Sequence, residues 1–146
     1  MRVEFPPPDN PSSWAHVFEI IDEYPHTEYW RAYKANVKEV LDRCIAENLH
    51  EDFRAGTSLN DIVFSTALKH GLKRGEPQVA FSYTPKKEEF YIAYATRALI
   101  WGDPISLETI SGVEGAHALL KQYLLRLWKE TKPELPIPPE LLSSKL

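Results

Sequence analysis

Cysteine is almost absent from this chain, since Cys44 is the only one among 146 residues. A single thiol excludes a disulfide within the chain and every metal site that needs several cysteine ligands. Long apolar runs are missing as well, and no segment approaches the roughly 18 apolar residues that cross a bilayer. The first residues, MRVEFPPP, lack the apolar stretch of a secretory signal. We therefore expect a cytoplasmic protein that does not bind membranes.

A large excess of one charge is also missing. The 17 basic and 21 acidic residues leave a net charge of −4, which argues against a dedicated nucleic-acid binder but leaves room for a local basic patch. Hydrophobic residues make up 43% of the chain and charged residues 26%, which is the composition of an ordinary soluble globular protein. A chain of this length fits one domain.

Proline marks the limits of that domain. Eight of the twelve prolines lie in two clusters, Pro6, Pro7, Pro8 and Pro11 near the start and Pro133, Pro136, Pro138 and Pro139 near the end. Proline fixes φ and has no backbone N–H, so both clusters favour extended segments over helices and inner strands. We predict a proline-rich arm over 1–11, one domain over 12–132 and a proline-rich tail over 133–146. The tail has the pattern of a polyproline-II peptide that docks on a partner, and the alternative is that it packs along its own domain.

Two runs of alternating residues, 78–83 and 90–95, are joined by the short polar segment 84–89. A period of two predicts strands with one buried face, so these runs indicate a β-hairpin. The bulky side chains of the two strands should meet on one face, leaving a face of small residues plus Tyr91. Because an isolated hairpin is marginally stable, we expect further strands, with 2–5 and 98–101 as candidates.

Four helices are indicated elsewhere in the chain. They begin at Ser12 or Ser13, at Thr27, at Ser58 and at Ser111, and they end before Pro25, near Ile45, at Gly71 and before Pro133. Ser58 with Asp61, and Ser111 with Glu114, have the spacing of capping boxes. The sequence therefore predicts the α+β class, with a small antiparallel sheet built on the hairpin at about 78–95 and about four helices packed on one of its faces.

Two Glu-x-x-His motifs, Glu47 with His50 and Glu114 with His117, are the strongest chemical pattern in the chain. Residues three apart on a helix share a face, and carboxylate-bridged di-metal bundles present half of their ligands in this way. Such a site needs a further glutamate on each of two other helices, and the sequence offers no convincing second one. Glu114 also fits a capping box, and His50 falls where its helix should end. We therefore predict no metal site and no cofactor.

Patterns that would indicate catalysis are weak. Cys44 lies in the apolar stripe of the second helix, so we expect a buried thiol rather than a nucleophile paired with a histidine. The sequence has neither a glycine-rich phosphate loop after a strand nor a nucleophile elbow. Whether the chain is an enzyme stays open, and the residues favour a negative answer. A small enzyme or ligand-binding domain with an unrecognised pocket is one alternative function.

A second alternative is a nucleic-acid-binding domain of the winged-helix kind. Helices followed by a hairpin have that order, with 58–70 as the recognition helix and the hairpin turn as the tip of the wing. The basic residues of this alternative are Lys69, Lys73, Arg74, Lys86 and Lys87. Against it, the candidate recognition helix opens with Asn60 and Asp61, and the lysine pair of the turn is followed by two glutamates.

The leading hypothesis is a non-enzymatic domain that binds another protein, such as an inhibitor, an immunity or antitoxin protein, or an accessory factor. It depends on the lack of catalytic patterns, on the aromatic content of 12% and on the two proline-rich segments. The candidate contact residues are Tyr91, Trp101, Leu125 and Trp128, because exposed aromatic and apolar side chains anchor interfaces. A homodimer formed through a sheet edge or through the last helix would use the same apolar surfaces.

Overall fold

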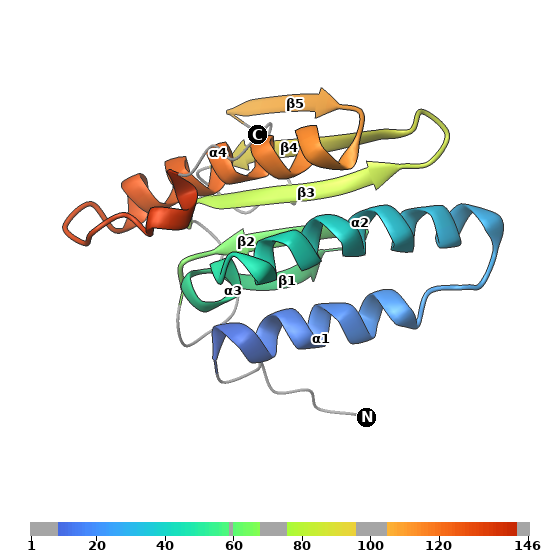
Figure 1. Ribbon diagram of the computed structural model, residues 1–146, viewed down its shortest axis with the longest axis horizontal. Coiled ribbons are helices and arrows are strands. Elements are labelled where there is room, and N and C mark those ends of the chain that lie inside the picture. The colour runs from blue at the N-terminus through green and yellow to red at the C-terminus, as the bar shows by residue number, and fades with distance from the viewer. Residues whose placement is uncertain (1–8, 59, 68–75, 96–104, 143–146) are drawn as a thin grey trace.

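The computed structural model describes residues 9–58, 60–67, 76–95 and 105–142. They form two layers, a five-stranded antiparallel sheet and a layer of helices on one of its faces (Figure 1). The predicted α+β class, with helices packed on one face of an antiparallel sheet, is therefore confirmed. Among the described residues, no helix has both the length and the apolar character that a membrane span requires.

The sheet is a simple meander, in which every strand pairs with the next one along the chain. Its strands are β1 (Arg54–Ser58), β2 (Asp61–Ser65), β3 (Gln78–Thr84), β4 (Glu89–Ala95) and β5 (Ser106–Ile110). β3 and β4 form the predicted hairpin, and their register places Phe81 opposite Ile92 and Tyr83 opposite Phe90. The bulky side chains of both strands thus belong to the core on the helix-covered face, as the alternation predicted.

The helices are α1 (Asn10–Asp22), α2 (Glu28–Ala46), the one-turn α3 (Leu49–Asp52), α4 (Val113–Thr131) and the short 3₁₀ helix η1 (Pro139–Leu141). Thr27 caps α2 as predicted. The predicted cap of the first helix is wrong, because Asp9 caps α1 and its carboxylate accepts from the Ser12 N–H at 2.8 Å. Pro11 fits in the first turn of α1, where a backbone N–H would have no partner in the helix.

The capping box predicted at Ser111 and Glu114 does not form either. Gly112 precedes the first turn of α4, and no side chain caps this helix. The φ of Gly112 is 89°, a conformation that glycine adopts without strain. Glycine is needed again at 115, where a Cβ atom would come within 2.7 Å of the Ile110 side chain. Glycine geometry and close packing, rather than a side-chain hydrogen bond, thus set the turn between β5 and α4.

The helix predicted from Ser58 to Gly71 is wrong over the residues that the structure describes. Residues 61–65 form β2, which pairs with β1 on one side and with β3 on the other. Ile62, Val63 and Phe64 are β-branched or aromatic and all three are buried, which suits them to a strand inside a sheet. β5 and α3 were not predicted, and the candidate strands 2–5 and 98–101 lie outside the described residues.

The core lies between the sheet and the helices. Trp14 of α1 is its largest fully buried side chain, and its Nε1–H donates to the Phe53 carbonyl at 2.8 Å. α2 buries most of the predicted apolar stripe, and Cys44 is buried within it as predicted. α4 packs over β3 and β4 with the face that contains Leu120 and Leu127.

The described part of the proline-rich tail lies against the rest of the chain. Trp128 Nε1–H donates to the Pro136 carbonyl at 3.2 Å, Ile137 packs against the core, and Leu141 is buried. These contacts support the second interpretation of the tail, in which it packs along its own domain rather than waiting for a partner.

Candidate functional site

The residues of the two Glu-x-x-His motifs come together only in part. Glu47, directly after α2, places its carboxylate between two side chains of α4. One oxygen contacts His117 Nε2, and the other accepts a hydrogen bond from Lys121 Nζ at 2.6 Å. The side chains of Glu47, His117 and Lys121 are 22%, 18% and 8% exposed. We call these three residues the Glu47 cluster, and it joins α2 to α4.

Lys121 makes the Glu47 cluster an ion pair rather than half of a metal site, because its ammonium already neutralises the carboxylate. His50 lies apart, with its ring 6.4 Å from the ring of Trp14. Glu114 is exposed on the first turn of α4. Within the described residues, no three His, Cys, Asp or Glu side chains are grouped as metal ligands would be. The four candidates therefore divide into one contacting pair and two separate residues.

Burial dominates the electrostatics around the Glu47 cluster. It lowers the pKa of His117, while the Glu47 carboxylate acts in the opposite direction and the positive charges of Lys121 and Arg43 add to the lowering. Burial also raises the pKa of the Cys44 thiol far above its usual range, and the negative charge of Glu47 raises it further. Because the thiolate is the reactive form, Cys44 is unsuited to act as a nucleophile.

Tyr91 belongs to a polar cluster at the end of the sheet where β1 turns into β2. Its hydroxyl donates to the Asp61 carboxylate, and Ser82 Oγ donates to the Asn60 carbonyl at 3.2 Å. The Tyr33 hydroxyl, from α2, donates to the same carbonyl. Burial raises the pKa of both Asp61 and Tyr91. These hydrogen bonds connect Asn60 and Asp61 to β3, β4 and α2. The Tyr91 hydroxyl therefore already has a hydrogen-bond partner within the chain.

The other predicted contact residues have three different positions. Trp128 is buried, with its ring 5.8 Å from that of Phe53. Leu125 is half-buried and lines a groove of about 540 Å³ on the outer face of α4. The remaining residues of this α4 groove are Gln122, Arg126, Lys129, Glu130 and Pro133. Trp101 lies outside the described residues.

The basic residues of the nucleic-acid alternative are described only at the hairpin turn. Lys86 and Lys87 are exposed between β3 and β4, whereas Lys69, Lys73 and Arg74 lie outside the described residues. The predicted recognition helix includes residues 61–65, which form β2 instead. The recognition helix that a winged-helix domain places in the DNA major groove is therefore not formed by residues 61–65.

The open sheet edge formed by β5 is a feature that the sequence did not locate. β5 pairs with β4 on one side, and no strand in the described part of the chain pairs with it on the other (Figure 1). Leu107 lies opposite Ala93, on the face away from the helices, and is 54% exposed. Ile105, directly before the strand, is exposed to the same extent. In the sequence, the apolar residues Ile105 and Leu107 alternate with the polar residues Ser106 and Glu108, and this alternation was the available signal for a strand.

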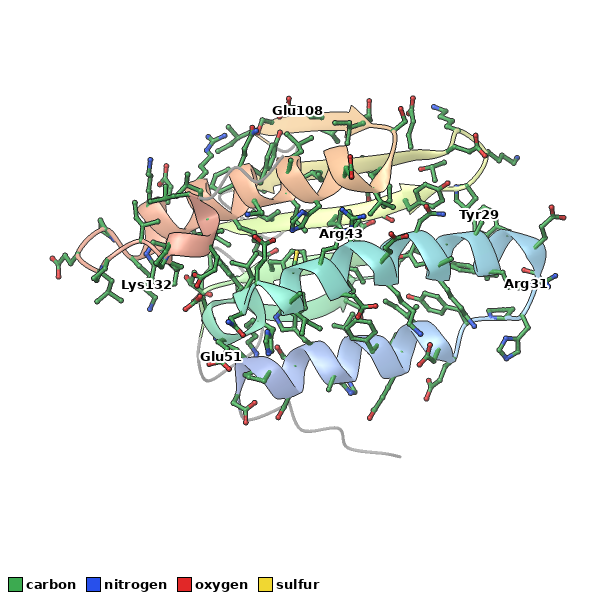
Figure 2. All side chains as sticks on the ribbon, viewed as in Figure 1. Tyr29, Arg31, Arg43, Glu51, Glu108 and Lys132 are labelled. Carbon is green, nitrogen blue, oxygen red and sulfur yellow. The ribbon has the colours of Figure 1, made fainter. Side chains whose placement is uncertain are left out.

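On its helix-covered face, this edge carries two opposite charges in fixed positions. The Tyr123 hydroxyl donates to Glu108 Oε2 at 2.7 Å, and Figure 2 shows Glu108 on β5 at the outer edge of the sheet. Ser106 Oγ accepts from Arg126 Nη1 at 3.3 Å, and the Arg126 guanidinium lies 4.1 Å from the centre of the Tyr94 ring. Because Arg126 also lines the α4 groove, the two features adjoin. We call Ile105, β5 and Arg126 the β5 edge surface.

No protein-family model, curated protein or solved structure matches this chain.

Proposed function

We propose that the chain is a non-enzymatic protein-interaction domain, which binds another protein chain by pairing a strand with β5. The observation that carries this proposal is the exposed apolar edge, with Leu107 on β5 and Ile105 directly before it. An edge strand presents a row of unpaired N–H and C=O groups. Addition of a strand satisfies these groups, and the neighbouring side chains select the partner.

The opposite edge of the sheet supports this proposal by contrast, because α1 protects it. Ser13 Oγ of α1 accepts from the Ala55 N–H at 3.0 Å, and Trp14 donates to the Phe53 carbonyl just before β1. Side chains of α1 thus satisfy two of the backbone groups at this edge. β5 has no such cover among the described residues, and the face of the sheet away from the helices exposes Leu107 and Ile105 at this edge.

Inhibitors, immunity or antitoxin proteins and accessory factors all act by binding of this kind, and the proposal covers these classes together. The cytoplasmic location expected from the sequence is part of the same proposal. Catalysis has weaker support in the described residues. Cys44 is buried with a raised pKa, and the carboxylate of Glu47 is compensated by Lys121.

Replacing Leu107 by lysine tests the proposal, because a lysine on an edge strand opposes strand addition. We expect a tagged wild-type chain to retain a protein partner from native lysate, and Leu107→Lys to retain about tenfold less of it. The matched control is Ser58→Lys, which adds the same charge at an exposed position of β1, the other edge strand. Quantitative mass spectrometry of the bound fraction gives the ratio. Equal retention by Leu107→Lys and the wild type would contradict binding at β5.

A further inference from the structure

We infer that the strand that pairs with β5 belongs to a second copy of this chain, in an antiparallel two-fold arrangement centred on Leu107. This inference rests on the proposed function and names its partner. It is carried by the β5 edge surface, where the positions of Glu108 and Arg126 are complementary to those of their own symmetry mates.

The register follows from the geometry of antiparallel strands. When a two-fold axis perpendicular to the sheet lies midway between the two copies of Leu107, these residues face each other. The ten-stranded sheet then keeps all its helices on one side. Ser106 then faces the partner's Glu108, and Glu108 faces the partner's Ser106. Thr109 faces the partner's Ile105. Residues that face each other lie on the same side of the sheet.

The helix-covered side of this pairing brings opposite charges together. Arg126 donates a hydrogen bond to Ser106 of its own copy. Because Glu108 faces the partner's Ser106, its carboxylate lies next to the partner's Arg126. The two-fold axis repeats this ion pair, which gives two charge pairs across the junction. Both groups are held in place beforehand, Glu108 by the Tyr123 hydroxyl and Arg126 by the ring of Tyr94. Fixed charges lose less side-chain entropy when they pair.

The other side of the pairing covers the exposed apolar residues. Leu107 packs against the partner's Leu107, and Ile105 of each copy lies beside Thr109 of the other. Leu107 and Ile105 are two of the five large hydrophobic side chains that are exposed among the described residues. Removing them from water stabilises the pairing.

Neighbouring registers are opposed by charge. An axis through Glu108 would place the two Glu108 carboxylates directly opposite each other. An axis through Ser106 would bring the two Arg126 guanidinium groups together. Like charges directly opposite each other on adjacent strands are destabilising. Of these three registers, the one centred on Leu107 gives complementary contacts on both faces of β5.

Two charge reversals test this inference by sedimentation velocity of the purified full chain. In Glu108→Arg alone, the new arginine lies beside the partner's Arg126, so two positive charges meet. In Arg126→Glu alone, the new glutamate lies beside the partner's Glu108, so two negative charges meet. Each variant should weaken dimerisation by about tenfold or more. In an equimolar mixture each variant supplies the charge that the other lacks, so mixed dimers should form with nearly the affinity of the wild type. Glu108→Gln and Arg126→Gln remove the charges without reversing them and should weaken dimerisation less, and circular dichroism of every variant checks its fold.

A wild-type dimer that each reversal weakens and the mixture restores supports the inference. A dimer that neither reversal weakens, or that the mixture fails to restore, overturns the pairing centred on Leu107. A wild-type chain that stays monomeric up to about 1 mM overturns the second copy as partner. In that case the lysate experiment still tests the proposed function separately. It compares how much bound protein of any kind Leu107→Lys and Ser58→Lys retain.

Discussion

Trp14→Ala is expected to lower the free energy of unfolding by about 4 kcal/mol, the largest effect of any single substitution considered for this protein. The Trp14 side chain is 1% exposed, and its ring lies 5.2 Å from that of Phe64. Alanine would leave a large cavity between α1 and the sheet, and the Phe53 carbonyl would lose its donor. Since small domains are stable by about 5 to 15 kcal/mol, this loss should bring the chain close to unfolding.

Urea denaturation followed by far-UV circular dichroism measures this change. Trp14→Phe is the matched variant, because it keeps most of the ring and removes the N–H group, and it should cost about 1 to 2 kcal/mol. Tyr29→Ala removes an aromatic ring that is 43% exposed and should cost about 0.5 kcal/mol or less. A loss below about 1 kcal/mol for Trp14→Ala would show that α1 does not depend on this contact.

Glu47→Ala is expected to cost about 2 to 3 kcal/mol, because it leaves the ammonium of Lys121 without the carboxylate at a position where little water reaches it. The effect should stay below that of a fully buried pair, since Glu47 is 22% exposed. His117 would also lose its contact with the carboxylate. The same denaturation measurement gives the value.

The double variant Glu47→Gln with Lys121→Met distinguishes the cause of this loss. It removes both charges together, so it should be within about 1 kcal/mol of the wild type, which makes it more stable than Glu47→Ala. Glu39→Ala is a surface control, since its pair with Arg43 at 3.5 Å is exposed and contributes about 0.5 kcal/mol or less. A double variant as unstable as Glu47→Ala would show that removal of the carboxylate beside the Lys121 ammonium is not the cause.

The hairpin of β3 and β4 could be predicted from sequence because each strand has one face in the core. Bulky side chains alternate with small ones and Tyr91 over 78–83 and 90–95, and the bulky ones pack in the core under the helices. β2 was mistaken for a helix because Ser58 and Asp61 have the spacing of a capping box, although Ile62, Val63 and Phe64 favour a strand. Asp61 instead accepts the hydroxyl of Tyr91, a contact that local sequence cannot reveal.

Of the candidate site, only the residues that belong to short sequence motifs could be predicted. Glu47 and His117 were singled out as members of separate motifs, but their contact depends on how α2 packs against α4. Lys121 lies one turn after His117 on the same helix face, so its spacing was a usable signal that was not recognised. β5 was missed because it is short and exposed on its outer side, so burial imposes a weaker pattern on its residues.

A disulfide cross-link at position 107 tests most directly whether β5 is the surface where a second chain binds. In the two-fold pairing the α-carbons of the two Leu107 residues are about 4.5 to 5.5 Å apart, which lies within the range of a disulfide. The matched control is Thr109→Cys, since the two Thr109 residues are about 14 Å apart in the same pairing. Cys44 is buried and should not interfere. We predict that Leu107→Cys forms a covalent dimer under mild oxidation and that Thr109→Cys does not, whereas equal cross-linking of the two variants, or none in either, would contradict the pairing of β5 with a second copy centred on Leu107.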